Sequence, residues 1–143
     1  MPAEVVRVVI DANVFVSAAI GSGPSTRLIN QWMSGQALFE VILCPRLIGE
    51  ISDVLHRPRL RKRIGAAEAS DFVAVISALP SLVPDPDEID VTTRDCDDDY
   101  LVALGREHLV EFIVTGDDDL LEWEEQQPRT IAPAAFEQWL GKR

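Results

Sequence analysis

Aspartates stand at three places where their spacing could support chemistry. Asp11 directly follows the apolar run 5–10, Asp117 follows the apolar run 111–115, and residues 97–99 are three consecutive aspartates that open an apolar helical pattern. Carboxylates that crowd together raise one another's pKa and cost stability unless a cation compensates them. Mg²⁺ prefers oxygen ligands of this kind. Each aspartate taken singly also fits a helix cap, so the pattern as a whole is what indicates a metal site.

The elements that must position these aspartates follow from the hydrophobic patterning. Short apolar runs rich in β-branched residues predict buried parallel strands, at residues 5–10, 38–44, 111–115, about 129–131 and, more briefly, 81–83. Helical periodicity predicts helices after Asp11, from an N-cap at Ser25 to a stop at Gly35, and in four later segments, 45–57 before Pro58, 66–79, 97–109 and 133–142. The alternation predicts a three-layer α/β/α sandwich around a parallel sheet of four to five strands, with residues 1–143 forming one domain.

Parallel sheets bind ligands beyond the carboxyl ends of their strands, where loops and helix starts converge. Asp11 and Asp117 fall at two such ends, and the helix opened by residues 97–99 leads into the strand before Asp117. Glu50 lies about one turn into the helix that follows the second strand. We therefore expect these acidic groups at one edge of the sheet.

The net charge of −11 argues against a nucleic-acid partner, because phosphate binding normally requires a basic surface. The charge is segregated, however, since eight acids fall within residues 85–99 and six within 117–125. The segment 57–63 contains five cations: Arg57, Arg59, Arg61, Lys62 and Arg63. This basic segment fits either a solvated helix face or a contact strip for phosphates or an acidic partner, and both interpretations stay open.

Other functional classes find little support. The apolar runs are far shorter than the ~20 residues that span a membrane, and no basic segment precedes the first of them, so we expect a cytoplasmic protein that makes no membrane contact. The two cysteines and two histidines lack the spacing of a zinc site. Neither a Walker-type nor a dinucleotide-binding glycine motif occurs.

Four segments together resemble a known family. They are "VVIDANVFVSA", "LIGEISDVL", "RDCDDDYLVALG" and "FIVTGDDDLL". In this order and separation they resemble the PIN-domain family, and in particular its VapC-type toxins of toxin–antitoxin pairs. The likeness covers essentially the whole chain. Each segment alone is weakly specific, but the four in register are a specific signal.

The resemblance implies an α/β/α fold and a metal-dependent ribonuclease that uses Mg²⁺ or Mn²⁺. It implies RNA as substrate, an antitoxin protein as partner, and a homodimer. Carried over residue by residue, it assigns catalysis and metal binding to Asp11, Glu50, Asp99 and Asp117, with Asp119 as a secondary ligand and with Asn13, Ser17 and Thr115 as supporting polar residues. The basic segment 57–63 would then contact the nucleic acid.

The three consecutive aspartates are not equivalent. We expect Asp97 to cap the helix, Asp98 to be a solvated charge of the first turn, and Asp99 to enter the metal pocket. A shift of the helix start by one or two residues would transfer that role to Asp98 or Asp97.

Two rival functions remain. Receiver domains and aspartate-nucleophile phosphatases also place an aspartate after a strand, but the phosphatase pattern requires a second one where this chain has Asn13. Receiver domains and these phosphatases together form the first rival, a phosphotransfer protein. Both require a lysine after a later strand, and the lysines here are Lys62 and Lys142. The second rival is a catalytically silent module whose acidic face binds a basic peptide. It would bind its partner without divalent ions and without nuclease activity.

Overall fold

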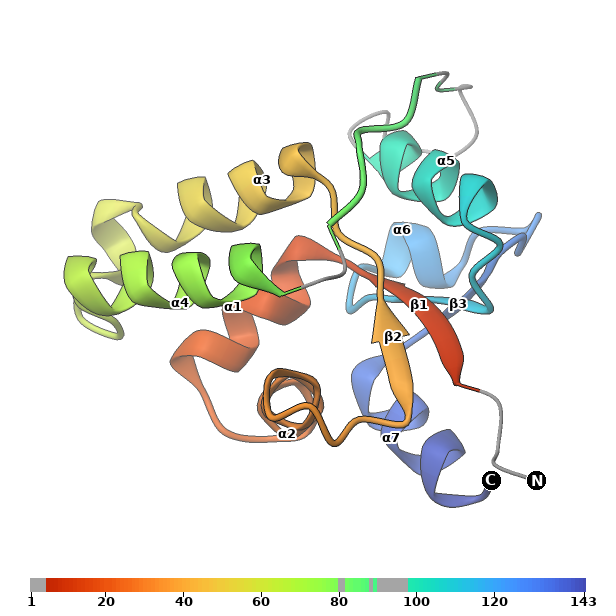
Figure 1. The fold of residues 1–143 in the computed structure, drawn as a ribbon, viewed down its shortest axis with the longest axis horizontal. Coiled ribbons are helices and arrows are strands. Elements are labelled where there is room, and N and C mark those ends of the chain that lie inside the picture. Colours follow the sequence, from red (N-terminus) through yellow and green to blue (C-terminus); the bar gives the residue numbers. More distant parts are fainter. Residues whose placement is uncertain (1–4, 80–81, 88, 90–97) are drawn as a thin grey trace.

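The computed structural model describes residues 5–79, 82–87, 89 and 98–143, and these residues contain one parallel four-stranded sheet (Figure 1). The strands are β1 (Val6–Ile10), β2 (Phe39–Val41), β3 (Phe112–Val114) and β4 (Arg129–Ile131), in the order β2-β1-β3-β4. The register places Ile10 opposite Val114, so β1 and β3 end side by side. The predicted parallel α/β architecture is confirmed. Around the predicted strand 81–83, Leu82 makes an isolated bridge to Leu43, and residue 81 lies outside the described residues.

Helices cover both sides of this sheet. They are α1 (Ala12–Ile20), α2 (Pro24–Met33), α3 (Pro45–Leu55), α4 (Ala66–Ala78), α5 (Asp99–Glu107), α6 (Asp118–Leu121) and α7 (Pro133–Gly141), with a short 3₁₀ helix η1 (Pro58–Leu60). In Figure 1, α1, α3 and α4 lie together to the left of the strands and α5 lies to the right. The helix α5 packs on β1 and β3, whereas α1 packs on α2 and α3. The layers therefore follow the predicted α/β/α order.

The central strand β1 fixes the backbone position of Asp11, which follows it directly. Val8, Val9 and Ile10 are fully buried, because helices cover both faces of β1. A strand covered on both faces needs a continuous apolar run rather than an alternating one, as the sequence has here. The backbone that carries Asp11 is thus fixed by the core on each side.

Two predicted helix boundaries differ from the structure. The helix α2 begins at Pro24 after an N-cap at Gly23, so Ser25 lies inside the helix instead of capping it. Proline suits a first helical position because its φ is already helical and its missing N–H has no partner there. Pro58 likewise opens η1, while α3 has already ended at Leu55.

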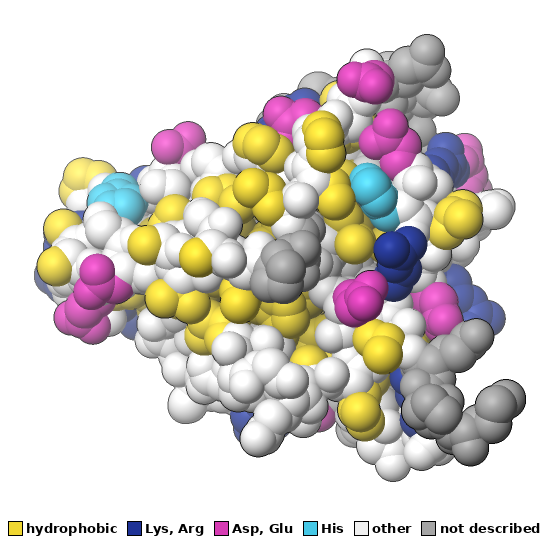
Figure 2. Space-filling view, viewed as in Figure 1, with side chains coloured by type: hydrophobic (Ala, Val, Ile, Leu, Met, Phe, Trp, Pro, Cys, Tyr) yellow, Lys and Arg dark blue, Asp and Glu magenta, His cyan; other side chains and the backbone are white. Residues whose placement is uncertain are grey.

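One face of the molecule shows how the surface charge is distributed. In Figure 2, hydrophobic side chains gather over α3 and α4, and the lysine and arginine side chains are scattered instead of forming a broad patch. An anionic ligand on this face would therefore be attracted by individual basic side chains and not by a broad basic patch. Among the described residues, no helix combines the length and the apolar character needed to cross a membrane.

Candidate metal centre

The carboxylate of Asp11 is held at the end of β1 by the sheet itself. Its backbone N–H donates to the carbonyl oxygen of Val114 at 2.9 Å, which extends the pairing of β1 with β3 by one residue. The side chain is 6% exposed. Thr115 Oγ1 donates to Asp11 Oδ2 at 2.8 Å, and Asn13 Nδ2 donates to the same oxygen at 3.3 Å. These two contacts hold the Oδ2 oxygen of the Asp11 carboxylate in place.

Asp117 is tied to the same group through Thr115. The backbone N–H of Asp117 donates to Thr115 Oγ1 at 3.0 Å, so the Thr115 hydroxyl links the two acidic residues. Asp117 Oδ1 in turn accepts the backbone N–H of Asp119 at 2.9 Å and thereby caps α6. One carboxylate oxygen of Asp117 thus fixes the turn, and the side chain is held in one orientation.

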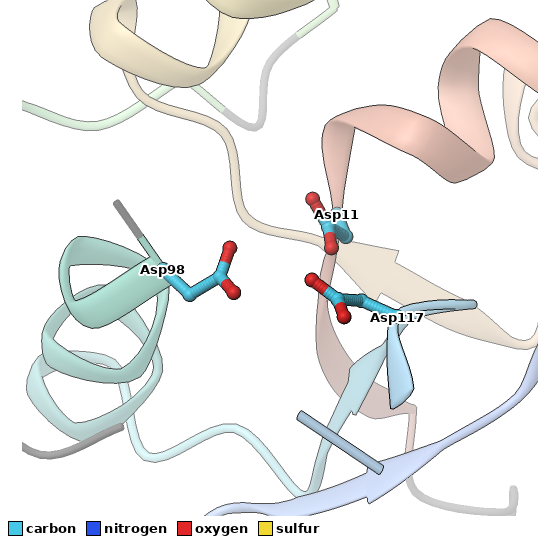
Figure 3. Close-up of side chains that lie close together, drawn as sticks. All are labelled: Asp11, Asp98 and Asp117. Carbon is cyan, nitrogen blue, oxygen red and sulfur yellow. The ribbon is translucent and has the colours of Figure 1, made fainter. Parts of the chain in front are cut away.

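A third carboxylate, that of Asp98, faces Asp11 and Asp117 from the start of α5 (Figure 3). Ligand oxygens of the three residues all lie within 4.8 Å of one another. Asp98 occupies the N-cap position of α5, but its side chain makes no capping hydrogen bond. Three chain segments far apart in the sequence therefore direct carboxylates into one small space.

The electrostatics of this acidic triad, Asp11, Asp98 and Asp117, call for a cation. Burial raises the pKa of Asp11, and the nearby Asp117 carboxylate raises it further, while the hydrogen bond from Thr115 opposes the shift. No lysine or arginine of the described segments forms an ion pair with Asp11 or Asp117. Oxygen ligands on opposite sides of one Mg²⁺ are about 4 Å apart. The all-oxygen donor set and its spacing therefore fit a hard divalent cation.

The triad lies in the wall of a cavity of about 670 Å³, which we call the acidic cleft. Its lining residues are Asp11, Ala12, Asn13, Val16, Ser17, Glu50, Asp53, Val54, Arg57, Arg59, Asp98 and Asp117. Glu50 and Asp53 are one turn apart on α3, so they face the cleft together. Five carboxylates and two guanidinium groups therefore surround this cavity, which suits a phosphate ester and its counter-ion.

Glu50 also lies close to a buried tyrosine. Tyr100 is fully buried, and its pKa is raised, first by burial and then by the neighbouring carboxylates of Glu50 and Asp11. The guanidinium of Arg46 covers the Tyr100 ring at 4.2 Å. Tyr100 therefore lies near the carboxylates of Glu50 and Asp11.

Comparison with known proteins identifies the fold and the family. A family model described as "PIN domain" matches residues 7–119, which include every member of the triad. The chain belongs to the PIN-domain family. The crystal structure of PAE2754 from Pyrobaculum aerophilum is similar to this chain with a TM-score of 0.66, at 18% sequence identity, over 99% of this chain and 93% of that one. Among curated proteins, no sequence matches this chain significantly.

Membership of the PIN family gives the triad a chemical context. PIN domains are generally metal-dependent nucleases, and an acidic cluster of this kind fits metal binding. The family assignment confirms the resemblance at the level of the PIN domain. The more specific assignment to the VapC-type toxins stays a prediction.

The PIN fold brings together most of the acids predicted from the sequence. Asp11 and Asp117 meet as expected, and Glu50 lines the same cleft. Asp98 joins them, although we expected it to be a solvated charge. Asp99 is instead the first residue of α5, is 2% exposed and is not part of the triad. Asp97, the expected cap, lies outside the described residues.

The predicted supporting and secondary residues differ in how they relate to the acidic triad. Asn13 and Thr115 contact Asp11 directly, and Ser17 lines the cleft from α1. Asp119 contributes its backbone N–H to Asp117 but is not among the residues that line the cleft. Asp53 was not predicted from the sequence. Its position one turn after Glu50 on a predicted helix would have indicated that both carboxylates share one helix face.

The PIN fold also separates the basic segment 57–63 into distinct environments. The segment forms η1 and the turn after it, so it is not the face of a regular helix. Arg57 and Arg59 line the acidic cleft. Arg61 donates from Nη2 to the carbonyl oxygen of Leu55 at 2.6 Å, at the end of α3. Lys62 is exposed and lines neither this cleft nor the neighbouring cavity that contains Arg63.

Proposed function

We propose that this protein is a divalent-metal-dependent ribonuclease that hydrolyses RNA phosphodiester bonds. The observation that carries the proposal is the convergence of Asp11, Asp98 and Asp117 within 4.8 Å at the carboxyl end of a parallel sheet. Membership of a family that consists generally of nucleases supports it. The two arginines in the wall of the acidic cleft supply positive charge for a phosphate beside the metal ligands.

In this proposal the triad holds Mg²⁺ or Mn²⁺, and the chain positions the reacting groups. A bound ion of this type lowers the pKa of water and stabilises negative charge on phosphate oxygens. Thr115 and Asn13 orient the Asp11 carboxylate, and Asp117 is oriented by its cap on α6. Glu50, which lines the same cleft, would accept the proton of the attacking water.

The decisive experiment compares RNA cleavage by wild type, Asp11→Asn and Asp117→Asn in Mg²⁺, in Mn²⁺ and in EDTA. We expect both substitutions to lower the cleavage rate on the order of 10³-fold or more, because each removes charge that must hold the cation. Asp118→Asn is the matched control, since Asp118 is the exposed neighbour of Asp117 and lines no part of the cleft.

Each outcome of this experiment is informative. Metal-dependent cleavage that both substitutions abolish and Asp118→Asn preserves supports the proposal. Cleavage that persists in EDTA, or that is unchanged in both Asn variants, contradicts it. Circular dichroism of each variant verifies that a loss of activity does not come from unfolding.

We further propose that the protein is the toxin of a toxin–antitoxin pair and acts as a homodimer. The order and spacing of the four motifs support the toxin assignment, and the acidic cleft is suited to a basic side chain of an antitoxin. Induced expression should then arrest cell growth, and Asp11→Asn should abolish the arrest. Growth that continues at full rate with active wild-type protein would contradict a toxin role. Light scattering tests the dimer.

The alternative function is a silent module that binds a basic peptide in the acidic cleft. The observation in its favour is the presence of five carboxylates along one cavity. A silent module would bind an arginine-rich peptide with neither divalent-ion binding nor RNA cleavage. Calorimetric titration with Mn²⁺ separates the two functions, because only the nuclease requires an ion at the triad.

A further inference from the structure

A second cavity adjoins the acidic cleft and shares one residue with it. This second cavity has a volume of about 390 Å³ and is lined by Ser17, Ile20, Gly21, Ser22, Gly23, Pro24, Ser25, Thr26 and Arg63. Ser17 also lines the acidic cleft, so the two cavities meet at this exposed residue of α1. The acidic cleft and the second cavity therefore adjoin at α1, and we call the two cavities together the path.

Cations from one short segment stand along both parts of this path. Arg57 and Arg59 line the acidic cleft, and Arg63 lines the second cavity. All three side chains belong to exposed residues. Their guanidinium groups form no hydrogen bond or ion pair with any other residue in the described part of the chain. They therefore do not neutralise the acids of the cleft by direct pairing within the described residues.

Arg61 shows what a structural arginine in this segment does. Its Nη2 is bonded to the Leu55 carbonyl oxygen, and it lines neither cavity. Lys62 is exposed and also lines neither cavity. The positive charge of the segment is thus divided by position, and three of its five cations border the path.

We propose that Arg57, Arg59 and Arg63 contact successive phosphates of one single RNA strand that runs from the acidic triad past Ser17 into the second cavity. This inference rests on the proposed function, because it assigns the residues that bind the substrate and the path of the substrate at that same site. Guanidinium groups match phosphate oxygens in geometry and charge. With a net charge of −11 on the whole chain, such local contacts must supply the attraction for RNA.

The shape of the path favours a single strand over a duplex. A single strand is flexible enough to follow two adjoining concave cavities and to present one phosphate to the buried triad. An A-form duplex is a stiff cylinder that proteins contact mostly by its overall shape and across its shallow groove.

The test measures binding apart from cleavage. Fluorescence anisotropy in EDTA follows the binding of a labelled single-stranded RNA of about 12 nucleotides, a length typical of single-strand binding sites. The variants are Arg57→Ala/Arg59→Ala, Arg63→Ala and Lys62→Ala. The matched control is Arg129→Ala/Lys142→Ala, which removes two exposed charges from β4 and from the end of α7. KM and kcat of RNA cleavage in Mn²⁺ are measured in parallel.

We expect Arg57→Ala/Arg59→Ala to weaken binding and raise KM by about tenfold or more, with a much smaller change in kcat. The slope of log K against log salt should fall by about 1.4, because each phosphate contact on a single strand contributes about 0.7. Arg63→Ala should have about half this effect on the slope. Its effect should disappear with an RNA of about two nucleotides, which does not reach the second cavity. Lys62→Ala should weaken binding less than either.

Equal weakening by the control pair, or by Lys62→Ala and Arg63→Ala alike, would overturn the inference and leave only an effect of net charge. Duplex RNA that binds as tightly as single-stranded RNA would overturn the path, because a stiff duplex cannot follow two adjoining cavities. The two proposals fail in different ways. Arginine-dependent RNA binding without metal-dependent cleavage would contradict the ribonuclease, whereas cleavage that is indifferent to all three arginines would contradict the path.

Discussion

The acidic triad and the basic segment 57–63 border the same cleft, yet the protein holds them in opposite ways. Asp11 is 6% exposed and is fixed by the sheet, by Thr115 and by Asn13. Arg57 and Arg59 are exposed, and the structure assigns their guanidinium groups no partner within the described residues. The first group is preorganised around a small ion, while the second can adapt to a larger and flexible ligand.

This difference has an energetic meaning. Like charges held side by side destabilise the metal-free fold, and a bound cation removes this repulsion. The same repulsion therefore lowers metal-free stability and favours ion binding. Exposed arginines cost the fold little, and they lose side-chain freedom only when a ligand orders them. Substitutions in the triad should therefore change metal binding, RNA cleavage and metal-free stability, whereas substitutions of the exposed arginines should have little effect on stability. Four comparisons test this difference.

The largest difference should appear between neighbouring aspartates. Asp98→Asn removes a member of the triad and should slow metal-dependent RNA cleavage by about 10²-fold to 10³-fold. Asp99→Asn, compared at the same folded fraction, should slow it less. Cleavage rates at saturating Mn²⁺, together with melting curves, measure both. A greater loss from Asp99→Asn would favour the sequence-based assignment of Asp99 to the metal pocket over Asp98.

Removal of the hydroxyl that links Asp11 and Asp117 should have the next largest effect. Thr115→Val leaves both carboxylates in place but deletes the hydrogen bond to Asp11 and the acceptor for the Asp117 N–H. Loss of an orienting contact to a metal ligand typically lowers activity or metal affinity by about 10-fold to 100-fold. Thr115→Ser retains the hydroxyl and should recover most of the activity. Equal activity in the Val and Ser variants would show that orientation of Asp11 does not matter.

The metal-free protein should be more stable without the Asp11 charge. Because burial raises the pKa of Asp11 in the folded state, folding favours the protonated form. That contribution is fully present below the unfolded pKa and is lost as the pH rises through the raised pKa of the folded state. In EDTA, urea unfolding should show wild type losing stability over this interval, and Asp11→Asn should lose less. Saturating Mn²⁺ should reverse the order at neutral pH.

The smallest effect separates two arginines of the basic segment by stability alone. Arg61→Ala removes the hydrogen bond to the Leu55 carbonyl oxygen and should lower the free energy of unfolding by about 1 kcal/mol. Arg59→Ala removes an exposed side chain and should change it by less than about 0.5 kcal/mol. Urea denaturation measures both variants. Equal destabilisation would mean that Arg59 has a structural role as well.

Much of the fold was predictable because its signals are local. Continuous apolar runs predict β1 and β3, and parallel pairing brings their ends together, so Asp11 and Asp117 could be placed without coordinates. The choice between Asp98 and Asp99 was not predictable in this way. Successive residues of a helix point about 100° apart, and the sequence does not define the helix start to one residue.

The division of the basic segment was also beyond the sequence. Its five cations are nearly consecutive, and their separate environments depend on how η1 and the turn after it redirect the chain. Asp53 could have been found, since it is one turn from Glu50 on the predicted helix. It lies within the same quoted segment "LIGEISDVL", but the resemblance assigned a role in that segment to Glu50 alone.

The central claim is that Asp11, Asp98 and Asp117 bind one divalent cation together. Calorimetric titration with Mn²⁺ tests it most directly, on wild type, Asp98→Asn, Asp117→Asn and the control Asp118→Asn. We predict saturable binding by wild type and Asp118→Asn, and loss of that binding in both Asp98→Asn and Asp117→Asn. Undiminished Mn²⁺ binding by either triad variant, or none by folded wild type, would contradict the account.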